Sequence, residues 1–368
     1  MKITDVTATV LASRYDRPIH FAHMELTERR IILVRVYTDQ GVVGLADVDG
    51  PPAGDMACVQ LIRDTFKPLL VGKDPLDIGA RNKDMFYVLD KLGRYRSLES
   101  YVLGAIDTAL WDILGKVTNQ PIHRLLGSRR SEINLYASLG QLPLGKIAEE
   151  VGKRAEEGFS GVKIRIGFQP EQDDAIVSEA RGVLKPTDRT KLMADANSGW
   201  SRAHAVQYGK RLEKHELHWL EEPLPPYDLT GYAHLAANLD TPVAMGEHEI
   251  FNRYDARDIL LAGAADILQP DLRQGISEVV KIAHLASAWD IPCIPHFFGP
   301  AIRFAAQVQV LASIDNYQLC EYPVAFDPIR FELTDPPLMA EKGKITVPEG
   351  PGLGVTLNEA TVKRYAVE

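Results

Sequence analysis

The sequence has 368 residues, 45% hydrophobic and 25% charged, and a formal net charge of -9 at pH 7. These proportions are typical of a soluble globular protein, and an acidic chain without a basic cluster makes nucleic acid and anionic membranes poor partners. The chain has only three cysteines, no apolar run of membrane-spanning length and no signal-peptide pattern at Met1. We therefore expect a protein of the reducing cytoplasm.

The first 50 residues show a β-sheet pattern. Strands are expected at residues 3–11, 30–38 and 42–46, with a hairpin turn at 39–41 between the last two. A polar loop is expected to join the first two strands, and it carries Tyr15, Arg17, His20 and His23.

Helical periodicity follows from residue 55. Helices are expected at residues 58–70, 81–92 and 97–116, and the last of these presents an apolar face that includes Ala105, Leu110 and Ile113. Residues 1–125 are therefore predicted to form an α+β capping domain that precedes the rest of the fold.

A repeated pattern occupies residues 126–325. Short apolar segments end on a polar residue, and three of these polar ends, Asp195, Glu221 and Glu247, are separated by two equal steps of 26. Such a spacing accommodates one strand and one helix with their loops. Eight such strands are expected, at residues 133–137, 161–166, 191–195, 218–221, 242–247, 266–271, 291–296 and 318–321.

Eight parallel strands alternating with helices would close a barrel, and the active site of such a barrel lies where its strands end. The predicted fold is therefore α/β, a (β/α)7–8 TIM-like barrel with an N-terminal α+β capping domain. Residues 350–354 are too rich in glycine and proline for another repeat. We expect residues 326–368 to pack back on the capping domain and complete it.

The strand-end acids suggest a metal site. Asp195, Glu221 and Glu247 would converge from three consecutive strands, and three anions that close together repel one another unless a cation binds them. Oxygen ligands of this kind suit a hard divalent ion, most often Mg²⁺, whereas zinc prefers histidine or cysteine. The sequence thus predicts one Mg²⁺ per subunit.

Other strand ends suggest acid–base chemistry. Asp271 and His296 end neighbouring strands, and a carboxylate bound to one imidazole nitrogen fixes the tautomer and raises the basicity of the other nitrogen. Lys163 ends the second strand, across the barrel mouth from His296, and Glu321 ends the eighth.

Each of these residues also has a simpler interpretation. A lone histidine after proline is more often a packed surface residue, and Lys163 or Arg165 could pair with a neighbouring acid. Glu222 is expected to form such a pair, because its side chain points away from the lumen if that of Glu221 points in. His248 and Glu249 lie past a strand end, so they are weaker metal-ligand candidates. Seven such groups at the ends of successive predicted strands support a functional site more strongly than any one of them alone.

These residues resemble the enolase superfamily, and more closely its mandelate racemase-like branch. The resemblance covers nearly the whole chain and includes the capping domain, residues 105–112, the three metal-site acids, the Asp-His pair and residues 350–354. The sister muconate-lactonizing branch is less similar, since it would carry a lysine where Asp271 stands.

The resemblance implies a magnesium ion on Asp195, Glu221 and Glu247 that binds a substrate carboxylate, with removal of the adjacent carbon-bound proton to give an enediolate. It further implies that His296, oriented by Asp271, is the general base or acid. Glu321 would hydrogen-bond the enediolate, Asn197 would contact substrate, and homo-oligomers are common in this family.

One residue departs from the racemase pattern. The branch often carries Lys-x-Lys on the second strand, whereas this chain has Lys163-Ile164-Arg165. Arginine stays protonated at working pH, so Arg165 is a poor base but a good electrostatic stabiliser. A reaction with mainly one base is therefore favoured over racemisation.

Single-base members of the family commonly dehydrate acid sugars to 2-keto-3-deoxy acids. The cap residues Tyr15 and His20 suit a hydroxyl-rich carboxylate substrate. Residues 266–271 and 350–354 also resemble sugar-lactone cycloisomerases. We expect dehydration of an acid sugar slightly ahead of cycloisomerisation, with a non-catalytic binding protein as the rival from another class.

Overall fold

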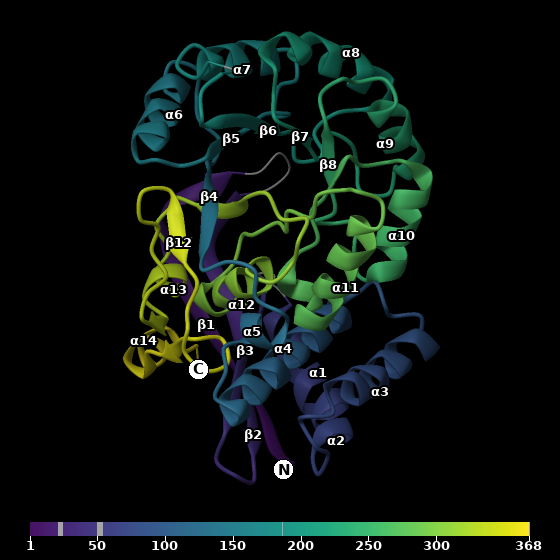
Figure 1. Ribbon diagram of the computed structural model, residues 1–368, viewed down its shortest axis with the longest axis vertical. Helices are drawn as coiled ribbons and strands as arrows, with labels where there is room; N and C mark the ends of the chain where they lie inside the picture. The colour runs from purple at the N-terminus through teal and green to yellow at the C-terminus, as the bar shows by residue number, and fades with distance from the viewer. Residues whose placement is uncertain (21–24, 50–53, 186, 368) are drawn as a thin grey trace.

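The computed structural model describes residues 1–20, 25–49, 54–185 and 187–367. The chain begins with an antiparallel three-stranded sheet, ordered β1 (Ile3–His20), β2 (Glu25–Thr38) and β3 (Val43–Asp49). Buried residues of this sheet pack on the cap helices, which lie beside it in Figure 1. The sheet and helices together make the predicted α+β cap.

The first two strands are longer than expected, so the predicted loop is wrong for residues 14–20. The pairing continues past an irregularity between Arg14, opposite Glu28, and Ile19, opposite Leu26. This irregularity absorbs the extra residues of β1, and two of the polar side chains that suggested a loop, Arg17 and His20, are exposed on the strand. His23 lies outside the described residues.

The cap helices are α1 (Asp55–Leu61), η1 (Ile62–Phe66), α2 (Lys67–Leu70), α3 (Ile78–Lys91), α4 (Leu98–Thr118) and α5 (Ile122–Leu125). The helix predicted at 58–70 is divided into three segments, since Pro68 lacks an amide hydrogen and a wider turn precedes it. Within α4, Asp112 accepts hydrogen bonds from the amides of Leu45 (2.9 Å) and Leu353 (3.0 Å). That carboxylate joins a cap strand, a cap helix and the C-terminal tail.

The barrel sheet is parallel and ordered β10-β4-β5-β6-β7-β8-β9. Its helices cover the outside of the strands (Figure 1). The strands are β4 (Glu132–Ser138), β5 (Gly161–Arg165), β6 (Lys191–Asp195), β7 (Leu220–Glu221), β8 (Val243–Met245), β9 (Ile267–Leu268) and β10 (Cys320–Pro323). The helices are α6 (Ile147–Glu156), α7 (Asp173–Arg181), α8 (Arg202–Leu212), η2 (Glu213–His215), α9 (Leu229–Ala236), α10 (Arg253–Ala262), η3 (Leu272–Gln274), α11 (Ile276–Ser287) and α12 (Ala301–Leu311).

The seventh predicted strand, residues 291–296, is held only by isolated bridges. Cys293 bridges Leu268, and His296 bridges Asp271. Pro292 and Pro295 have no amide hydrogen to donate, so a continuous ladder cannot form there. The segment still occupies the seventh position, beside β9, and the fold is the (β/α)7–8 barrel that the sequence predicts.

The chain returns to the cap after the barrel, through α13 (Pro328–Phe331), β11 (Thr334–Asp335), β12 (Lys344–Thr346), β13 (Thr356–Leu357) and α14 (Glu359–Tyr365). Strand β12 pairs antiparallel with β4, and Ala366 bridges Leu11 of β1. Figure 1 shows this yellow segment beside the purple β1. The boundaries at 125/126 and 325/326 stay a prediction.

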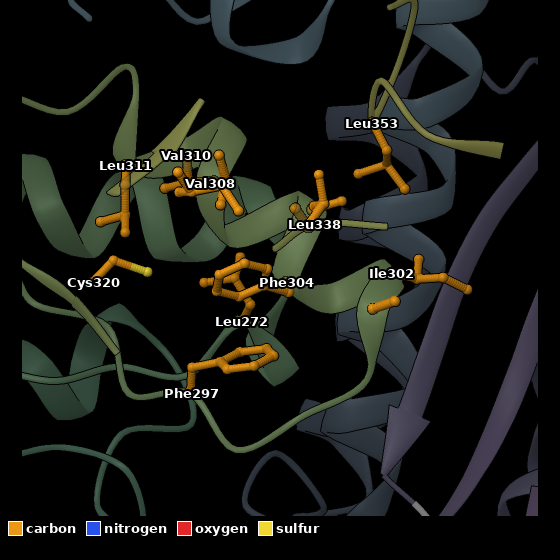
Figure 2. Packing of buried hydrophobic residues seen from close by; sticks show 14 of the residues in the cluster. Leu272, Phe297, Ile302, Phe304, Val308, Val310, Leu311, Cys320, Leu338 and Leu353 are labelled. Carbon is orange, nitrogen blue, oxygen red and sulfur yellow. The ribbon is translucent and has the colours of Figure 1, made fainter. Parts of the chain in front are cut away.

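A shared core joins the tail, the barrel and the cap. Figure 2 shows Phe297 and Phe304, whose ring centroids are 4.9 Å apart, with Leu338 and Leu353 of the tail in the same cluster. Leu11 and Ile31 of the cap sheet belong to it as well. Within the described residues, no helix combines the length and apolar composition that crossing a bilayer requires.

Candidate active site

A layer of buried side chains fills the barrel below the site. These residues lie on or directly beside the barrel strands and form one cluster: Tyr136, Met193, Trp219, Ala244, Ile267, Ile294 and Leu319. Because side chains alternate along a strand, the residue two positions further along faces the same side. Those positions hold Ser138, Asp195, Glu221, Gly246, Gln269, His296 and Glu321.

Glu247 does not follow this alternation of side chains. The position that continues the alternation is Gly246, directly after β8, and its φ of 141° is a conformation that other residues rarely adopt. A Cβ at this position would lie 2.9 Å from the backbone of Gln269. Glycine therefore lets the chain turn at this point, and Glu247 presents its carboxylate from the loop that follows.

Lys163 lies at the centre of the acidic residues. Its Nζ is 2.8 Å from Glu321 Oε1 and 3.6 Å from Asp195 Oδ2, and it also contacts the carboxylate of Glu221. Burial opposes the charge of the lysine, but these carboxylates outweigh burial and raise its pKa. Lys163 is therefore protonated in this arrangement and is not prepared to act as a base.

Arg165 contacts the carboxylate of Asp195 and is 8% exposed. Burial acts to lower its pKa, and the nearby acids, Asp195 first, raise it further than burial lowers it. Arg165 therefore stays charged, as its residue type predicts.

The other oxygen of Glu221 accepts two hydrogen bonds. Trp219 Nε1 and Gln269 Nε2 each donate to Oε2 at 2.9 Å. Burial raises the pKa of Glu221 to about 7, against the effect of Lys163. Sequence reasoning missed Trp219 and Gln269, although both lie two residues before a predicted site residue on the same face.

Asp271 and His296 form the predicted pair. His296 Nδ1 is 3.0 Å from Asp271 Oδ2, and each residue is 2% exposed. Burial favours the neutral imidazole, but the carboxylates of Glu247 and Glu321 raise the pKa of His296. Nε2 of His296 faces these acids, 3.2 Å from Glu247 Oε2 and 3.9 Å from Glu321 Oε2.

Asp271 is held in the ionised state. Its Oδ1 accepts a hydrogen bond from the amide of Arg273 at 2.8 Å, and Arg273 Nε lies 3.2 Å from Oδ2. Burial would raise the pKa of Asp271, yet Arg273 and Arg303 hold it far below its usual range. Neither arginine was a predicted site residue, because neither lies at a strand end.

Glu321 also stays ionised. Its Oε2 accepts the amide of Phe297 at 3.0 Å. Burial raises the pKa of Glu321, but Lys163 and His296 outweigh burial and lower it to about 2. An ionised carboxylate accepts hydrogen bonds and cannot donate one, so the role that the resemblance implies requires Glu321 to gain a proton when substrate is bound.

Glu222 pairs with His248, as expected of an acid that points away from the lumen. Nδ1 of His248 is 3.0 Å from Glu222 Oε2, and its Nε2 is 3.5 Å from Glu247 Oε1. Glu247 first, and then Glu222, raise the pKa of His248 to about 10, with burial opposing them. Throughout the described ranges, these three residues are the group whose potential metal ligands lie within 4.8 Å of one another.

The predicted magnesium ligands fit a hard divalent cation by their chemistry. Asp195 and Glu221 pair across adjacent strands, Glu247 follows the next strand, and all three offer carboxylate oxygens. In the structure, Lys163 and Arg165 neutralise Asp195 and Glu221, while Glu247 faces His248 and His296. The metal assignment of these three residues stays a prediction.

The predicted substrate-binding residues lie in different surroundings. Asn197 follows β6, and its amide donates to Asp195 Oδ1 at 2.8 Å. The hydroxyl of Tyr15 is buried without a hydrogen-bond partner in the described part of the chain. His20 is exposed at the end of β1, where its Nδ1 lies 3.4 Å from Glu25 Oε2. No hydrogen bond or ion pair among the described residues links His20 to the barrel site.

Asp47 lies at the cap side of the site and is 7% exposed. Burial raises the pKa of its carboxyl to about 7, although Arg303 opposes this. The unfolded chain ionises Asp47 near pH 3.9, so folding becomes less favourable as the pH rises from about 4 to about 7.

We predict that Asp47→Asn leaves the melting temperature unchanged at pH 5 and raises it at pH 8. The gain at pH 8 corresponds to about 1 to 4 kcal/mol of unfolding free energy, since the amide avoids burying a charge. Differential scanning calorimetry at the two pH values checks this. An equal effect of the substitution at both pH values would contradict a raised pKa at Asp47.

The fold and the site together define a member of the enolase superfamily. A parallel barrel lies against an α+β cap, and acids from consecutive strand ends face a histidine–aspartate pair. Residues 146–361 match the family model described as "Enolase C-terminal domain-like". Residues 4–127 match "Mandelate racemase / muconate lactonizing enzyme, N-terminal domain". The chain belongs to the mandelate racemase and muconate lactonizing enzyme family.

Similar proteins of known activity include two types of enzyme. The D-galactarolactone cycloisomerase of Agrobacterium fabrum is 35% identical over 99% of both chains. The L-talarate/galactarate dehydratase of Salmonella typhimurium is 32% identical over 91% of this chain and 82% of its own. An enolase from Bradyrhizobium, solved with magnesium and mandelic acid, has a TM-score of 0.88 and 29% identity and covers 100% of this chain and 99% of its own.

Proposed function

We propose that this protein is a magnesium-dependent enzyme that removes the proton next to the carboxylate of an acid sugar and then expels the oxygen on the following carbon. The observation that carries the proposal is the position of His296. Its Nδ1 is fixed by Asp271, and its buried Nε2 faces the carboxylates of Glu247 and Glu321. Two enzymes of known activity that are similar along most of the chain act on acid sugars or their lactones by name.

The proposed cofactor is one Mg²⁺ per chain, held by Asp195, Glu221 and Glu247. When bound, the ion would supply positive charge to the substrate carboxylate and to the negative charge that develops on it. Two carboxylates on adjacent strands and a third just after the next strand support this assignment, as does the magnesium in the Bradyrhizobium structure.

His296 takes the proton in the proposed reaction. Nε2 accepts the proton from the α-carbon, while the ionised Asp271 holds Nδ1–H and stabilises the imidazolium that forms. Lys163 and Arg165 stay charged on the other side of the site, so they stabilise negative charge and do not take a second proton. This asymmetry favours elimination over racemisation.

In dehydration, the β-hydroxyl leaves as water. The electron pair of the broken carbon–hydrogen bond forms the new carbon–carbon double bond, and the carbon–oxygen bond at the β-carbon breaks. In the proposed reaction, His296 then returns its proton to the departing hydroxyl. The resulting enol tautomerises to a 2-keto-3-deoxy acid, which is the product that we expect.

Cycloisomerisation of a sugar lactone is the second candidate. The same proton transfer occurs, but the ring oxygen leaves as a carboxylate and remains in the product. The likeness to the Agrobacterium cycloisomerase over 99% of both chains favours this candidate.

Proton NMR of the magnesium-loaded enzyme in deuterated water tests the proposal. We expect one acid sugar or lactone, from a panel of aldonates, aldarates and their lactones, to lose its α-proton and give a 2-keto-3-deoxy acid with deuterium at carbon 3. Turnover of open-chain acids supports dehydration, and turnover of lactones alone supports cycloisomerisation. Exchange with inversion and no elimination would contradict the single-base mechanism, and no exchange with any member would contradict the proposed substrate class.

We further propose that the protein acts in the cytoplasm as a homo-oligomer. The three cysteines, all free and buried, support the first point, because disulfides are rare in a reducing compartment. Light scattering of the purified protein tests the second, and a monomer at micromolar concentration would contradict it.

A further inference from the structure

Arg303 connects the cap to the barrel site. It is the third residue of α12 and is 3% exposed. Its Nη2 lies 2.5 Å from Asp49 Oδ1, and its Nε lies 3.8 Å from Asp47 Oδ1. Both acids belong to β3 of the cap. On the barrel side, Nη1 of Arg303 lies 3.7 Å from Asp271 Oδ1.

These contacts form a chain of charges that ends at the proposed base. Asp49 of the cap holds Arg303, Arg303 faces one oxygen of Asp271, and the other oxygen of Asp271 bonds His296 Nδ1. Each member from Arg303 onward is at most 3% exposed, so solvent and salt screen these interactions weakly.

Arg303 acts on Asp271 differently from Arg273. Arg273 lies on the short helix η3, which begins directly after Asp271, whereas Arg303 projects from a separate helix and pairs with an acid of the cap sheet. Arg303 can therefore fix Asp271 relative to the helix and the cap.

The loop before α12 leaves room for this guanidinium. Gly299 lies against Arg303, and a Cβ at residue 299 would overlap Nη2, Nε and Cζ of Arg303. Alanine at this position would displace the guanidinium without changing any charge. The geometry of the loop thus offers an independent way to move Arg303.

We propose that Arg303 is a positioning residue that holds Asp271, and through it the Nδ1-protonated tautomer of His296, in register with Asp49 of the cap. The catalytic part of this inference rests on the proposed function. The structural part, which concerns the tautomer of His296, is independent of the proposed function.

The kinetic test compares Arg303→Gln and Arg303→Lys with the wild-type enzyme. We expect Arg303→Gln to lower kcat about 10²-fold and to change KM less than about 3-fold, because a displaced base costs rate more than binding. Lysine, which keeps the charge, should recover at least about 10-fold of the loss. A raised KM with unchanged kcat would overturn the proposal, since Arg303 would then bind substrate directly.

The matched control is Arg81→Gln. Arg81 is also buried, at 8% exposure, but it pairs with Asp84 on α3 of the cap, away from the Asp271–His296 pair. We expect this variant to keep wild-type kcat and KM. An equal loss of kcat in Arg81→Gln would mean that removing any buried arginine weakens the enzyme, and it would overturn the specific role of Arg303.

The spectroscopic test needs no substrate. At a pH high enough to keep the imidazole neutral, nitrogen-15 NMR should show His296 protonated on Nδ1 in the wild-type protein and a mixture of tautomers in Arg303→Gln and in Gly299→Ala. An unchanged tautomer in both folded variants would overturn the proposal even if no substrate is found. If the tautomer changes while the substrate panel gives no turnover, the proposed function has failed and the role of Arg303 has not.

A double-mutant cycle tests the link to the cap. Asp49→Asn should shift the tautomer in the same direction as Arg303→Gln, and the two changes together should do no more than Arg303→Gln alone. Additive effects would show that Asp49 and Arg303 act separately, and they would overturn the connection to the cap.

Discussion

Replacing His296 with asparagine should lower kcat at least about 10³-fold while magnesium and substrate still bind. Asparagine is close in size and can donate a hydrogen bond to Asp271, but it has no basic nitrogen to take the proton. General-base catalysis typically contributes about 10²- to 10⁴-fold. Turnover of the substrate found by the NMR panel measures the loss, and isothermal titration calorimetry measures both binding steps.

An exposed histidine provides the matched control for this substitution. His284 lies on the outer face of α11, and His284→Asn should keep full turnover. If His296→Asn kept wild-type turnover, another group would be the base and the assignment of His296 would be wrong. If it lost substrate binding together with turnover, His296 would bind substrate and the loss could not be ascribed to proton transfer.

Replacing Lys163 with methionine should destabilise the metal-free protein by about 3 to 5 kcal/mol. The ammonium is 1% exposed and lies among the carboxylates of Asp195, Glu221 and Glu321. Its removal leaves these acids buried without their shared cation, and breaking a buried charge network in this way costs free energy of that size. Calorimetry in EDTA at pH 8 measures the loss.

Magnesium should raise the melting temperature of Lys163→Met more than that of the wild-type protein. The uncompensated acids attract a divalent ion more strongly once the lysine is gone. Lys191→Met is the control, because Lys191 begins β6 at an exposed position and should tolerate the change. Equal melting temperatures of Lys163→Met and wild type in EDTA would show that the acids are protonated without the lysine, contrary to the charges argued above.

The fold could be predicted because each barrel strand carries its own signal. An apolar body with a polar end recurs at nearly constant steps, and the structure places those ends at one mouth of the barrel. Two local errors have physical causes. Prolines at 292 and 295 reduce a predicted strand to isolated bridges, and the polar outer end of β1 resembles a loop because solvent covers it.

Four of the predicted site residues could be found because they lie at the ends of predicted barrel strands. Asp195, Glu221, His296 and Glu321 end barrel strands in phase with the lumen, and the structure brings them together. Their catalytic and metal-binding roles stay predictions that the experiments above test.

The residues that sequence reasoning missed reach the site from elsewhere in the chain. Arg303 approaches from the first turn of a helix, and its partner Asp49 precedes it by 254 residues in a different domain. No periodicity within either segment indicates that they meet. Only the packing of the cap on the barrel places them in contact, so three-dimensional structure was needed to find them.

The bond between Asp112 and the amide of Leu353 has a consequence for how the protein is made. A ribosome releases the cap helix that carries Asp112 long before it releases residue 353, and the whole barrel is synthesised in between. During that interval the carboxylate lacks one of its two backbone donors, and the shared core lacks the packing of Leu353. The cap can therefore reach its final form only after residue 353 has left the ribosome. A chain that stops before residue 353 should be removed by proteases, even when every residue of the proposed active site has been made.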